Sequence, residues 1–250
     1  MSVVIVTGAS RGIGRAIADV ILADVNAKVV AVARSQDKLA DLSNAYPGRV
    51  AVVAGDVTDH QVSVKAVETA VSQYGKLDAV VLNAGVIEPV GAIDAVSVAK
   101  WRQHFDVNVF SLVDLIATAM PELRKSHGRI VAVSSGASTH HYTGWYAYGC
   151  GKAAVNHLIM SIAEEEPDVT AISIAPGVVK TDMQSDIRTK CADGMGDDAQ
   201  KFHDLHANNQ LLEPDVPGTV YAKLALNGWD KSLNGQYLRF NDDALKAYQK

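Results

Sequence analysis

The stretch Val3–Gly14, with the sequence VVIVTGASRGIG, decides the fold. Val3–Val6 is a short β-branched run without charge, as in a strand that is buried on both faces. Gly8, Gly12 and Gly14 follow directly and open a helical pattern. Glycines let the backbone turn tightly and approach a ligand, and a helix N-terminus presents free N–H groups to a pyrophosphate. This strand–turn–helix order favours a dinucleotide site over an ordinary turn.

Apolar runs of the same type recur along the chain, at Lys28–Ala33, Val50–Ala54, Ala79–Leu82, Arg129–Val133 and Val169–Ile174. Amphipathic stretches separate them, and one of these, Asp59–Tyr74, precedes a glycine that is placed to end a helix. We expect Gly235–Phe240 to add a last strand at one edge. The alternation predicts an α/β fold, a single Rossmann-type doubly wound parallel sheet of about seven strands with helices on both faces.

Composition fits one domain spanning residues 1–250, because the chain is 48% hydrophobic and 20% charged. Its net charge of −5 argues against a surface for nucleic acid or anionic membrane. No apolar run approaches the roughly 20 residues of a membrane span. Cys150 and Cys191 fit no disulfide scaffold, and the N-terminus does not resemble a signal peptide, so we expect a cytoplasmic protein.

The least regular stretch is 181–210, which is polar and follows the last buried strand. We interpret it as a candidate lid over the site, and the alternative is an ordinary surface excursion.

The residues after the second strand bear on which dinucleotide binds. In NAD-binding folds a carboxylate at this point accepts hydrogen bonds from the ribose 2′-hydroxyl. Here the strand runs into Ala33-Arg34-Ser35, where no carboxylate is present. The Arg34 guanidinium would pair with a 2′-phosphate, and Arg11 in the glycine loop would add a second positive charge. The pattern therefore predicts NADP(H).

The glycine spacing G-x-x-x-G-x-G resembles that of the short-chain dehydrogenase/reductase family, and further motifs of that family follow in order along nearly the whole chain. These are Asp56, Asn83-Ala84-Gly85, Asn108, Ser135, Tyr148-x-x-x-Lys152, Pro176-Gly177 and Thr181. The resemblance implies the strand order 3-2-1-4-5-6-7. With the arginines above, it implies cofactor contacts by Gly8, Ser10, Arg11, Gly12, Ile13, Gly14, Arg34, Asp56, Val57, Asn83, Ala84, Gly85, Tyr148, Lys152, Pro176, Gly177, Val179 and Thr181.

The catalytic interpretation rests on Tyr148 and Lys152, which are four residues apart and therefore share a helix face. We expect the Lys152 ammonium and the positive nicotinamide ring to lower the pKa of the Tyr148 phenol, so that the phenol exchanges a proton with the substrate oxygen. Ser135 would hydrogen-bond that oxygen. By resemblance, Lys152 also holds the ribose hydroxyls, and Asn108 joins a proton relay through water to Lys152. Tyr146 has no lysine four residues later and is set aside.

The substrate pocket is expected between Ser135 and Tyr148, where aromatic residues suit flat or apolar carbonyl compounds. The local sequences at 134–138, 144–145, 164–167, 175–177 and 181–183 resemble sepiapterin reductases and benzil (diketone) reductases, which reduce vicinal dicarbonyls with NADPH. The predicted substrate residues are Ser135, His141, Tyr142, Trp145, Tyr148 and Met183. No metal site is expected, because the histidine pairs at 140–141 and 203–206 have no third ligand at usable spacing.

The favoured function is an NADPH-dependent carbonyl reductase that transfers hydride to a small ketone or vicinal dicarbonyl, with Tyr148 as general acid. An NADP+-dependent alcohol or sugar dehydrogenase uses the same residues in the opposite direction and stays open. A non-catalytic dinucleotide-sensing protein is disfavoured, because Ser135, Tyr148 and Lys152 are all present. The pattern leaves the physiological substrate open.

The resemblance also implies a homodimer or homotetramer, assembled through helices at about 108–124 and 147–165. The apolar content of these helices exceeds what one sheet-facing stripe requires. The residues that carry this argument are Leu112, Leu115, Ile116, Val155, Leu158, Ile159 and Ile162.

Overall fold

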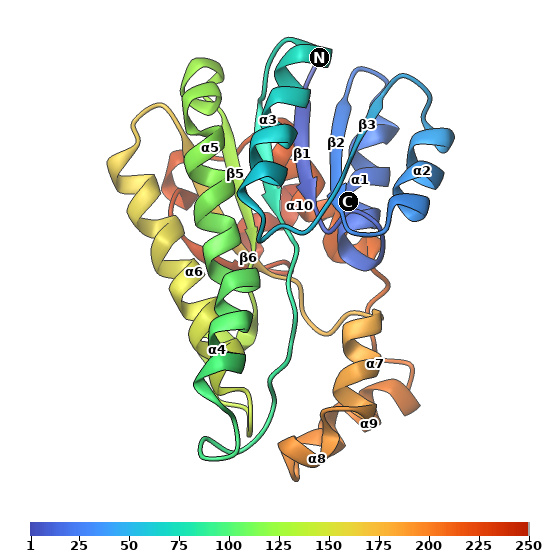
Figure 1. Ribbon diagram of the computed structural model, residues 1–250, viewed down its shortest axis with the longest axis vertical. Helices are drawn as coiled ribbons and strands as arrows, with labels where there is room; N and C mark the ends of the chain where they lie inside the picture. The colour runs from blue at the N-terminus through green and yellow to red at the C-terminus, as the bar shows by residue number, and fades with distance from the viewer. Residues whose placement is uncertain (250) are drawn as a thin grey trace.

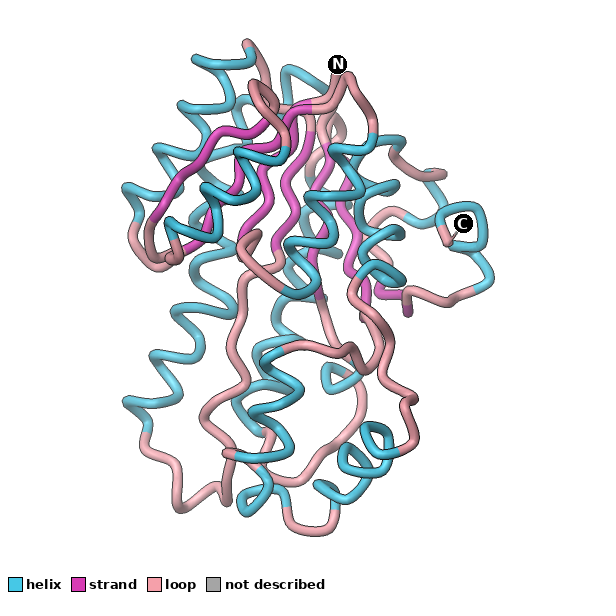
Figure 2. The backbone as a smooth tube through the Cα atoms, turned by 90° about the vertical axis from the view of Figure 1, so that its right-hand side faces the viewer, coloured by secondary structure: helices cyan, strands magenta, loops and turns pink. Residues whose placement is uncertain are grey.

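A parallel sheet forms the centre of the molecule in the computed structural model, which describes residues 1–249 (Figure 1). Its seven strands follow the order β3-β2-β1-β4-β5-β6-β7, as expected, and each neighbouring pair is parallel. The strands are β1 (Val3–Thr7), β2 (Lys28–Ala33), β3 (Val50–Ala54), β4 (Ala79–Leu82), β5 (Arg129–Val133), β6 (Thr170–Ala175) and β7 (Tyr237–Arg239). Figure 2 shows them side by side, with helices on both faces.

The helices are α1 (Gly12–Ala23), α2 (Gln36–Ala45), α3 (His60–Tyr74), α4 (Val98–Phe105), α5 (Ser111–Ser126), α6 (Tyr146–Glu165), α7 (Asp182–Thr189), α8 (Ala192–Met195), α9 (Asp198–Ala207) and α10 (Asp215–Asn227). A π-helical turn, Asp106–Phe110, joins α4 to α5. The expected end of α3 is confirmed, because Gly75 follows the helix in the left-handed conformation, with φ of 81°. At the start of α3, the Asp59 side chain caps the helix by accepting from the Gln61 backbone N–H.

Two apolar cores, one on each face of the sheet, hold the layers together. Val4 and Val6 of β1 face a core shared with α1, α2 and α10. Val3 and Ile5 face the opposite core, shared with α3, α5 and α6. This alternation follows from the two-residue period of a strand, and it explains why strands buried on both faces are continuous apolar runs in the sequence.

The polarity of residues 181–210 led us to expect an irregular segment, but the stretch is mostly helical. Helices α7, α8 and α9 occupy it, below the sheet in Figure 1. Their buried apolar residues are Ile187 in α7, Met195 in α8, and Ala199 and Phe202 in α9, and Cys191 is buried between α7 and α8. Each helix is too short to repeat an apolar position over several turns, so no helical period is evident in this polar stretch of the sequence.

The apolar residues that were expected to mark an interface on α5 and α6 are mostly part of the monomer core. Leu112, Leu115 and Ile116 are at most 5% exposed, and Val155 and Ile159 are fully buried. Leu158 and Ile162 pack against the same core. That argument for an interface was therefore wrong, because α5 and α6 bury these side chains against the sheet.

Candidate active site

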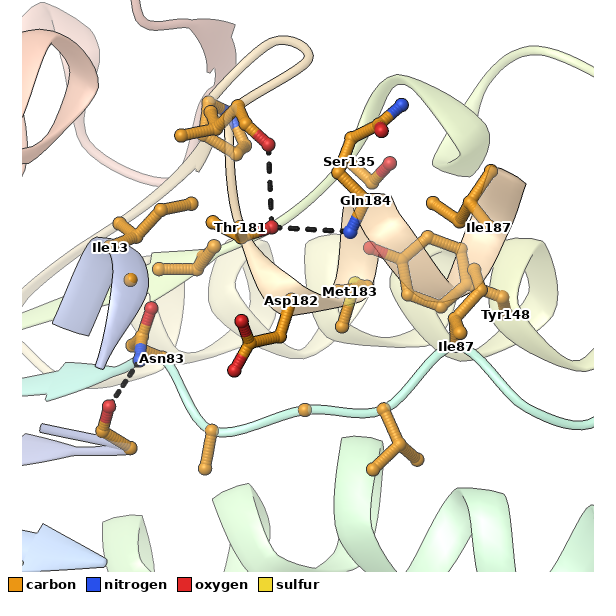
Figure 3. Close-up of a pocket in the computed structure, with 18 of the residues that line it drawn as sticks. Ile13, Asn83, Ile87, Ser135, Tyr148, Thr181, Asp182, Met183, Gln184 and Ile187 are labelled. Atoms are coloured by element: carbon orange, nitrogen blue, oxygen red, sulfur yellow. Dashed lines mark hydrogen bonds between the residues drawn. The ribbon is translucent and has the colours of Figure 1, made fainter. Parts of the chain in front are cut away.

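A cavity of about 620 Å³ lies at the carboxyl ends of the strands. Figure 3 shows part of its wall, with Ile13 and Asn83 on one side and Ser135 and Tyr148 on the other. The predicted cofactor residues that line it are Gly8, Ser10, Arg11, Gly12, Ile13, Arg34, Asp56, Val57, Asn83, Ala84, Gly85, Tyr148, Lys152, Pro176, Gly177, Val179 and Thr181. Gly14 and Asn108 do not line the cavity, and their roles are described below.

The glycine loop is packed so closely that side chains would not fit. Gly8 has φ of 68°, and a Cβ there would lie 2.6 Å from Nδ2 of Asn83. A Cβ on Gly14 would collide with the Gly8 carbonyl and with the same amide. Asn83 Nδ2 donates to the Thr7 carbonyl at 2.9 Å. The Asn83 segment therefore holds the loop in shape, and the helix N-terminus beside it forms a cradle that fits a pyrophosphate.

The two arginines predicted to select the cofactor have different surroundings. Arg34 is exposed and lines the cavity, and among residues 1–249 no carboxylate forms an ion pair with it. Arg11, by contrast, forms an ion pair with Asp182 of α7. Asp56 accepts hydrogen bonds from the Thr58 backbone N–H and hydroxyl, and these bonds, together with the Arg34 cation, lower the pKa of its carboxyl. Of the two guanidiniums, Arg34 is therefore the one that has no carboxylate partner among residues 1–249.

The predicted catalytic residues meet inside the cavity. Ser135, Tyr148 and Lys152 all line it, and the Ser135 hydroxyl lies near enough to the phenol to lower its pKa. Tyr148 and Lys152 stand on one face of α6 with only 8% and 4% exposure. Lys152 Nζ lies 5.8 Å from the centre of the Tyr148 ring and donates to the Val133 carbonyl at 2.6 Å. The hydroxyl of the neighbouring Ser134 instead donates to Asn156 Oδ1 at 2.6 Å, and this partner distinguishes it from Ser135.

Burial shifts the pKa values of this pair in opposite directions. It lowers the pKa of Lys152 to about 8. It raises the pKa of Tyr148, and the hydrogen bond with Ser135 opposes that shift without overcoming it. The expectation that protein groups lower the Tyr148 pKa was therefore wrong. A phenol with a raised pKa stays protonated at neutral pH, which suits a proton donor.

Asn108 is fully buried in the π-helical turn. Its Oδ1 accepts from the Val86 backbone N–H at 2.8 Å, and its Nδ2 donates to the Val86 carbonyl at 2.7 Å. A Cβ on Gly85 would lie 3.0 Å from Asn108 Oδ1 and 3.9 Å from Lys152 Nζ. Gly85 thus lies between these two side chains, so its lack of a side chain lets them approach each other.

Aromatic rings form one side of the cavity. The rings of Tyr142 and Trp145 are 4.8 Å apart, and Trp145 is stacked on Phe202 of α9 at 5.4 Å. Trp145 also meets the Tyr148 ring edge-on at 5.4 Å. Met183 lines the cavity as expected. His141 is exposed and does not line it, so its predicted substrate contact was wrong.

Several lining residues were missed from the sequence. The first turns of α7 bring Asp182, Gln184 and Ile187, and α9 brings Lys201, Phe202 and Leu205. The three-residue spacing of Ala199, Phe202 and Leu205 in α9 was the signal for the apolar members there. Tyr237 of β7 was also missed, although its hydroxyl donates to the Ser135 carbonyl at 3.0 Å and holds the backbone of that residue. These two residues are 102 positions apart, and no local pattern connects them.

Among residues 1–249, no group of three or more His, Cys, Asp or Glu side chains could hold a metal ion. In the same part of the chain, no helix has the length and apolar character for crossing a membrane.

A dinucleotide cradle that opens onto a Ser–Tyr–Lys set defines a nicotinamide-dependent oxidoreductase. The family described as short chain dehydrogenase matches residues 2–192. The chain belongs to this family. A benzil reductase ((S)-benzoin forming) of Saccharomyces cerevisiae is 46% identical over 99% of this chain and 98% of its own.

Solved structures agree with this assignment. A short chain dehydrogenase/reductase from Saccharomyces cerevisiae is 45% identical, with a TM-score of 0.98 and full coverage of both chains. A protein of the same organism described as cytoplasmic, with unknown function, is 43% identical, with a TM-score of 0.86 and full coverage of both chains.

Proposed function

We propose that this protein is an NADPH-dependent carbonyl reductase that transfers hydride to a small ketone or vicinal dicarbonyl, with Tyr148 as general acid. The observation that carries the proposal is the buried Tyr148 phenol, which contacts Ser135 and whose pKa is raised. Such a group holds a proton at neutral pH and can donate it to an oxygen that gains negative charge. The same group takes the proton back when the reaction runs in reverse, so the reductive direction is proposed from the likeness to a benzil reductase.

The chain's own groups have separate tasks in this reaction. The bound nicotinamide supplies the hydride. Ser135 donates a hydrogen bond to the substrate oxygen and stabilises the charge that develops there. Tyr148 delivers the proton, and the Ser135 hydroxyl, which lowers the pKa of the phenol, stabilises the phenolate that is left behind. By family resemblance, Lys152 also holds the ribose, and Asn108 connects Lys152 to a proton relay.

The preference for NADPH is argued from Arg34. Its guanidinium lies at the cavity wall and forms no ion pair with a carboxylate of the described chain, so it is available to a 2′-phosphate. Arg11 is a weaker candidate than the sequence suggested, because it already pairs with Asp182 at the surface. A carboxylate that would accept from a 2′-hydroxyl is missing after β2.

Vicinal dicarbonyls are the proposed substrates because of the aromatic wall and the benzil reductase relative. Tyr142, Trp145 and Phe202 offer flat apolar surface next to Tyr148. Benzil itself carries two aromatic rings beside its carbonyl pair, so it is the natural first substrate to test. Residues 181–210 are the proposed lid, because their helices supply Phe202 and Ile187 to the cavity wall.

A homodimer or homotetramer in the cytoplasm is also proposed. The residues that support assembly are the exposed apolar side chains Val113 on α5 and Met160 on α6, which are 43% and 44% exposed. Phe110, at the start of α5, is 55% exposed. These side chains lie on the helices through which the family is expected to assemble.

Oxidation of NADPH by the purified protein tests the proposal, with benzil, other diketones, quinones, pterins and simple ketones as substrates. We expect benzil to be reduced to benzoin, with NADH much less effective than NADPH. Polyols with NADP+ form the comparison arm. Faster turnover in that arm, or no turnover of any carbonyl compound, would contradict the proposal.

A further inference from the structure

His104 is a buried histidine that the catalytic scheme above does not use. It lies on α4, four residues before Asn108, and is 1% exposed. Its Nδ1 is 2.7 Å from the Glu88 carbonyl oxygen. Asn108 Nδ2 lies 2.7 Å from Nε2 and 3.5 Å from Nδ1, so Nε2 is its nearer partner on the ring. A carbonyl only accepts and an amide nitrogen only donates, so Nδ1 carries the hydrogen and Nε2 presents a lone pair. The two partners thus select the neutral Nδ1–H tautomer.

This bond completes the hydrogen bonding of the Asn108 amide nitrogen. One of its N–H groups donates to the Val86 carbonyl, and the other donates to His104. Without His104, one N–H of a fully buried amide would have no partner, at a cost that favours a rotated side chain. We infer that neutral His104 is a positioning residue, which fixes the orientation of Asn108 and through it the loop at Val86.

The effect reaches the reacting groups through the cavity wall. Val86 and its neighbour Ile87 both line the cavity, and Asn108 faces Lys152 across Gly85. Rotation of the Asn108 amide would release both of its bonds to Val86. The inference therefore rests on the proposed function, and it concerns the carbonyl half of the site, away from the cofactor phosphate at Arg34.

A protonated His104 would lose this role, since both ring nitrogens would carry hydrogen and Nε2–H would face an N–H of Asn108. The titratable side chains that face the ring are Tyr148, edge-on at 6.1 Å, and Lys152, both on α6. Glu88 contributes its carbonyl and is otherwise exposed. Burial, and then the Lys152 charge, lower the pKa of His104, against the raising effect of the Glu88 bond. His104 is thus neutral at neutral pH and charges only in acid.

Two substitutions separate the two properties of the His104 side chain, its hydrogen-bond acceptor and its ability to titrate. His104→Gln keeps an oxygen that can accept from Asn108 but does not titrate, whereas His104→Leu has no acceptor. We measure single-turnover reduction of benzil between about pH 5 and 8, together with NADPH affinity. The wild type should slow in acid, and His104→Gln should not show that loss. His104→Leu should be roughly 10- to 100-fold slower at every pH, with NADPH affinity unchanged. His157→Gln, at an exposed position of α6, is the control.

A spectroscopic measurement keeps the test independent of activity. In ¹⁵N spectra of the wild type, His104 should show the Nδ1–H tautomer, and the Asn108 side-chain amide signals should move in His104→Leu more than in His104→Gln. An Nε2–H tautomer, or equal acid-side profiles in all variants, would overturn the inference and leave the proposed function standing. Absence of any carbonyl reduction would instead refute the proposed function, and the spectra would still decide the role of His104.

Discussion

Lys152 is a buried cation, and this has a consequence for stability. In water its ammonium would titrate near a pKa of 10.5, and burial lowers that value to about 8. The unfolded chain therefore binds the proton more tightly than the folded chain does. The buried charge therefore lowers the free energy of unfolding most below pH 8, and this loss disappears as the pH rises toward 10.5.

Lys152→Met tests this linkage. The methionine has no charge to bury, so the difference in free energy of unfolding between variant and wild type should depend on pH. Between pH 8 and 10.5 that difference should shift in favour of the wild type by up to about 3 kcal/mol. Urea unfolding at a series of pH values measures it. A difference that is constant over this range would mean that Lys152 is not desolvated as the structure shows.

Arg34→Asp tests the choice of cofactor. The change removes a bidentate partner for the 2′-phosphate, adds repulsion and restores an acceptor for a 2′-hydroxyl. Preference should move from NADPH toward NADH, mainly through KM. Arg11→Ala is the comparison, and it should change the preference less, because Asp182 already pairs with Arg11. A wild-type protein that prefers NADH would show that Arg34 does not select NADPH.

At the scale of elements, the candidate lid is joined to the rest of the chain by backbone contacts between glycines. The Gly91 N–H donates to the Gly144 carbonyl at 3.1 Å. A Cβ on Gly144 would overlap the Gly194 carbonyl, and one on Gly194 would lie 2.9 Å from the Val90 carbonyl. The loop after β4, the segment before α6 and helix α8 therefore meet at a point where side chains do not fit.

Gly144→Ala should push α8 away from this junction. We expect a raised KM for the carbonyl substrate, by roughly tenfold or more if the displacement costs above 1.4 kcal/mol, and faster proteolysis within 181–210. Gly48→Ala is a matched control, because Gly48 has a similar φ of 70° but nothing within 4 Å of its Cβ position. Equal effects of the two substitutions on KM would show that backbone strain alone is responsible.

The sequence predicted some elements better than others, for physical reasons. The strands and the glycine loop were predictable, because double burial and a tight turn each demand particular residue types locally. The helices of 181–210 were not, since they are short and polar outside. The partner of Arg11 is 171 positions away, and the burial that raises the Tyr148 pKa comes from residues throughout the cavity. Such properties arise only when distant segments pack together.

At the scale of the whole molecule, assembly should depend on the exposed apolar side chains of α5 and α6. Met160→Glu, alone or with Val113→Glu, places a charge where a second copy would cover an apolar surface. Sedimentation at micromolar concentration should show a dimer or tetramer for the wild type and a shift toward monomer for the variants. Val25→Glu, at a 74% exposed position after α1, should leave the assembly unchanged. A monomeric wild type would reject the proposed assembly.

The central claim is that Tyr148 donates the proton, and Tyr148→Phe tests it most directly. The substitution keeps the ring and its packing against Trp145 but removes the transferable proton. Tyr146→Phe is the control, because Tyr146 is two positions away and 42% exposed. The measurement is single-turnover hydride transfer from NADPH to benzil, beside fluorescence titration of NADPH. We predict a loss of about 10²–10⁴-fold in Tyr148→Phe with NADPH affinity nearly intact, and no loss in Tyr146→Phe. A near-normal rate in Tyr148→Phe would contradict the account.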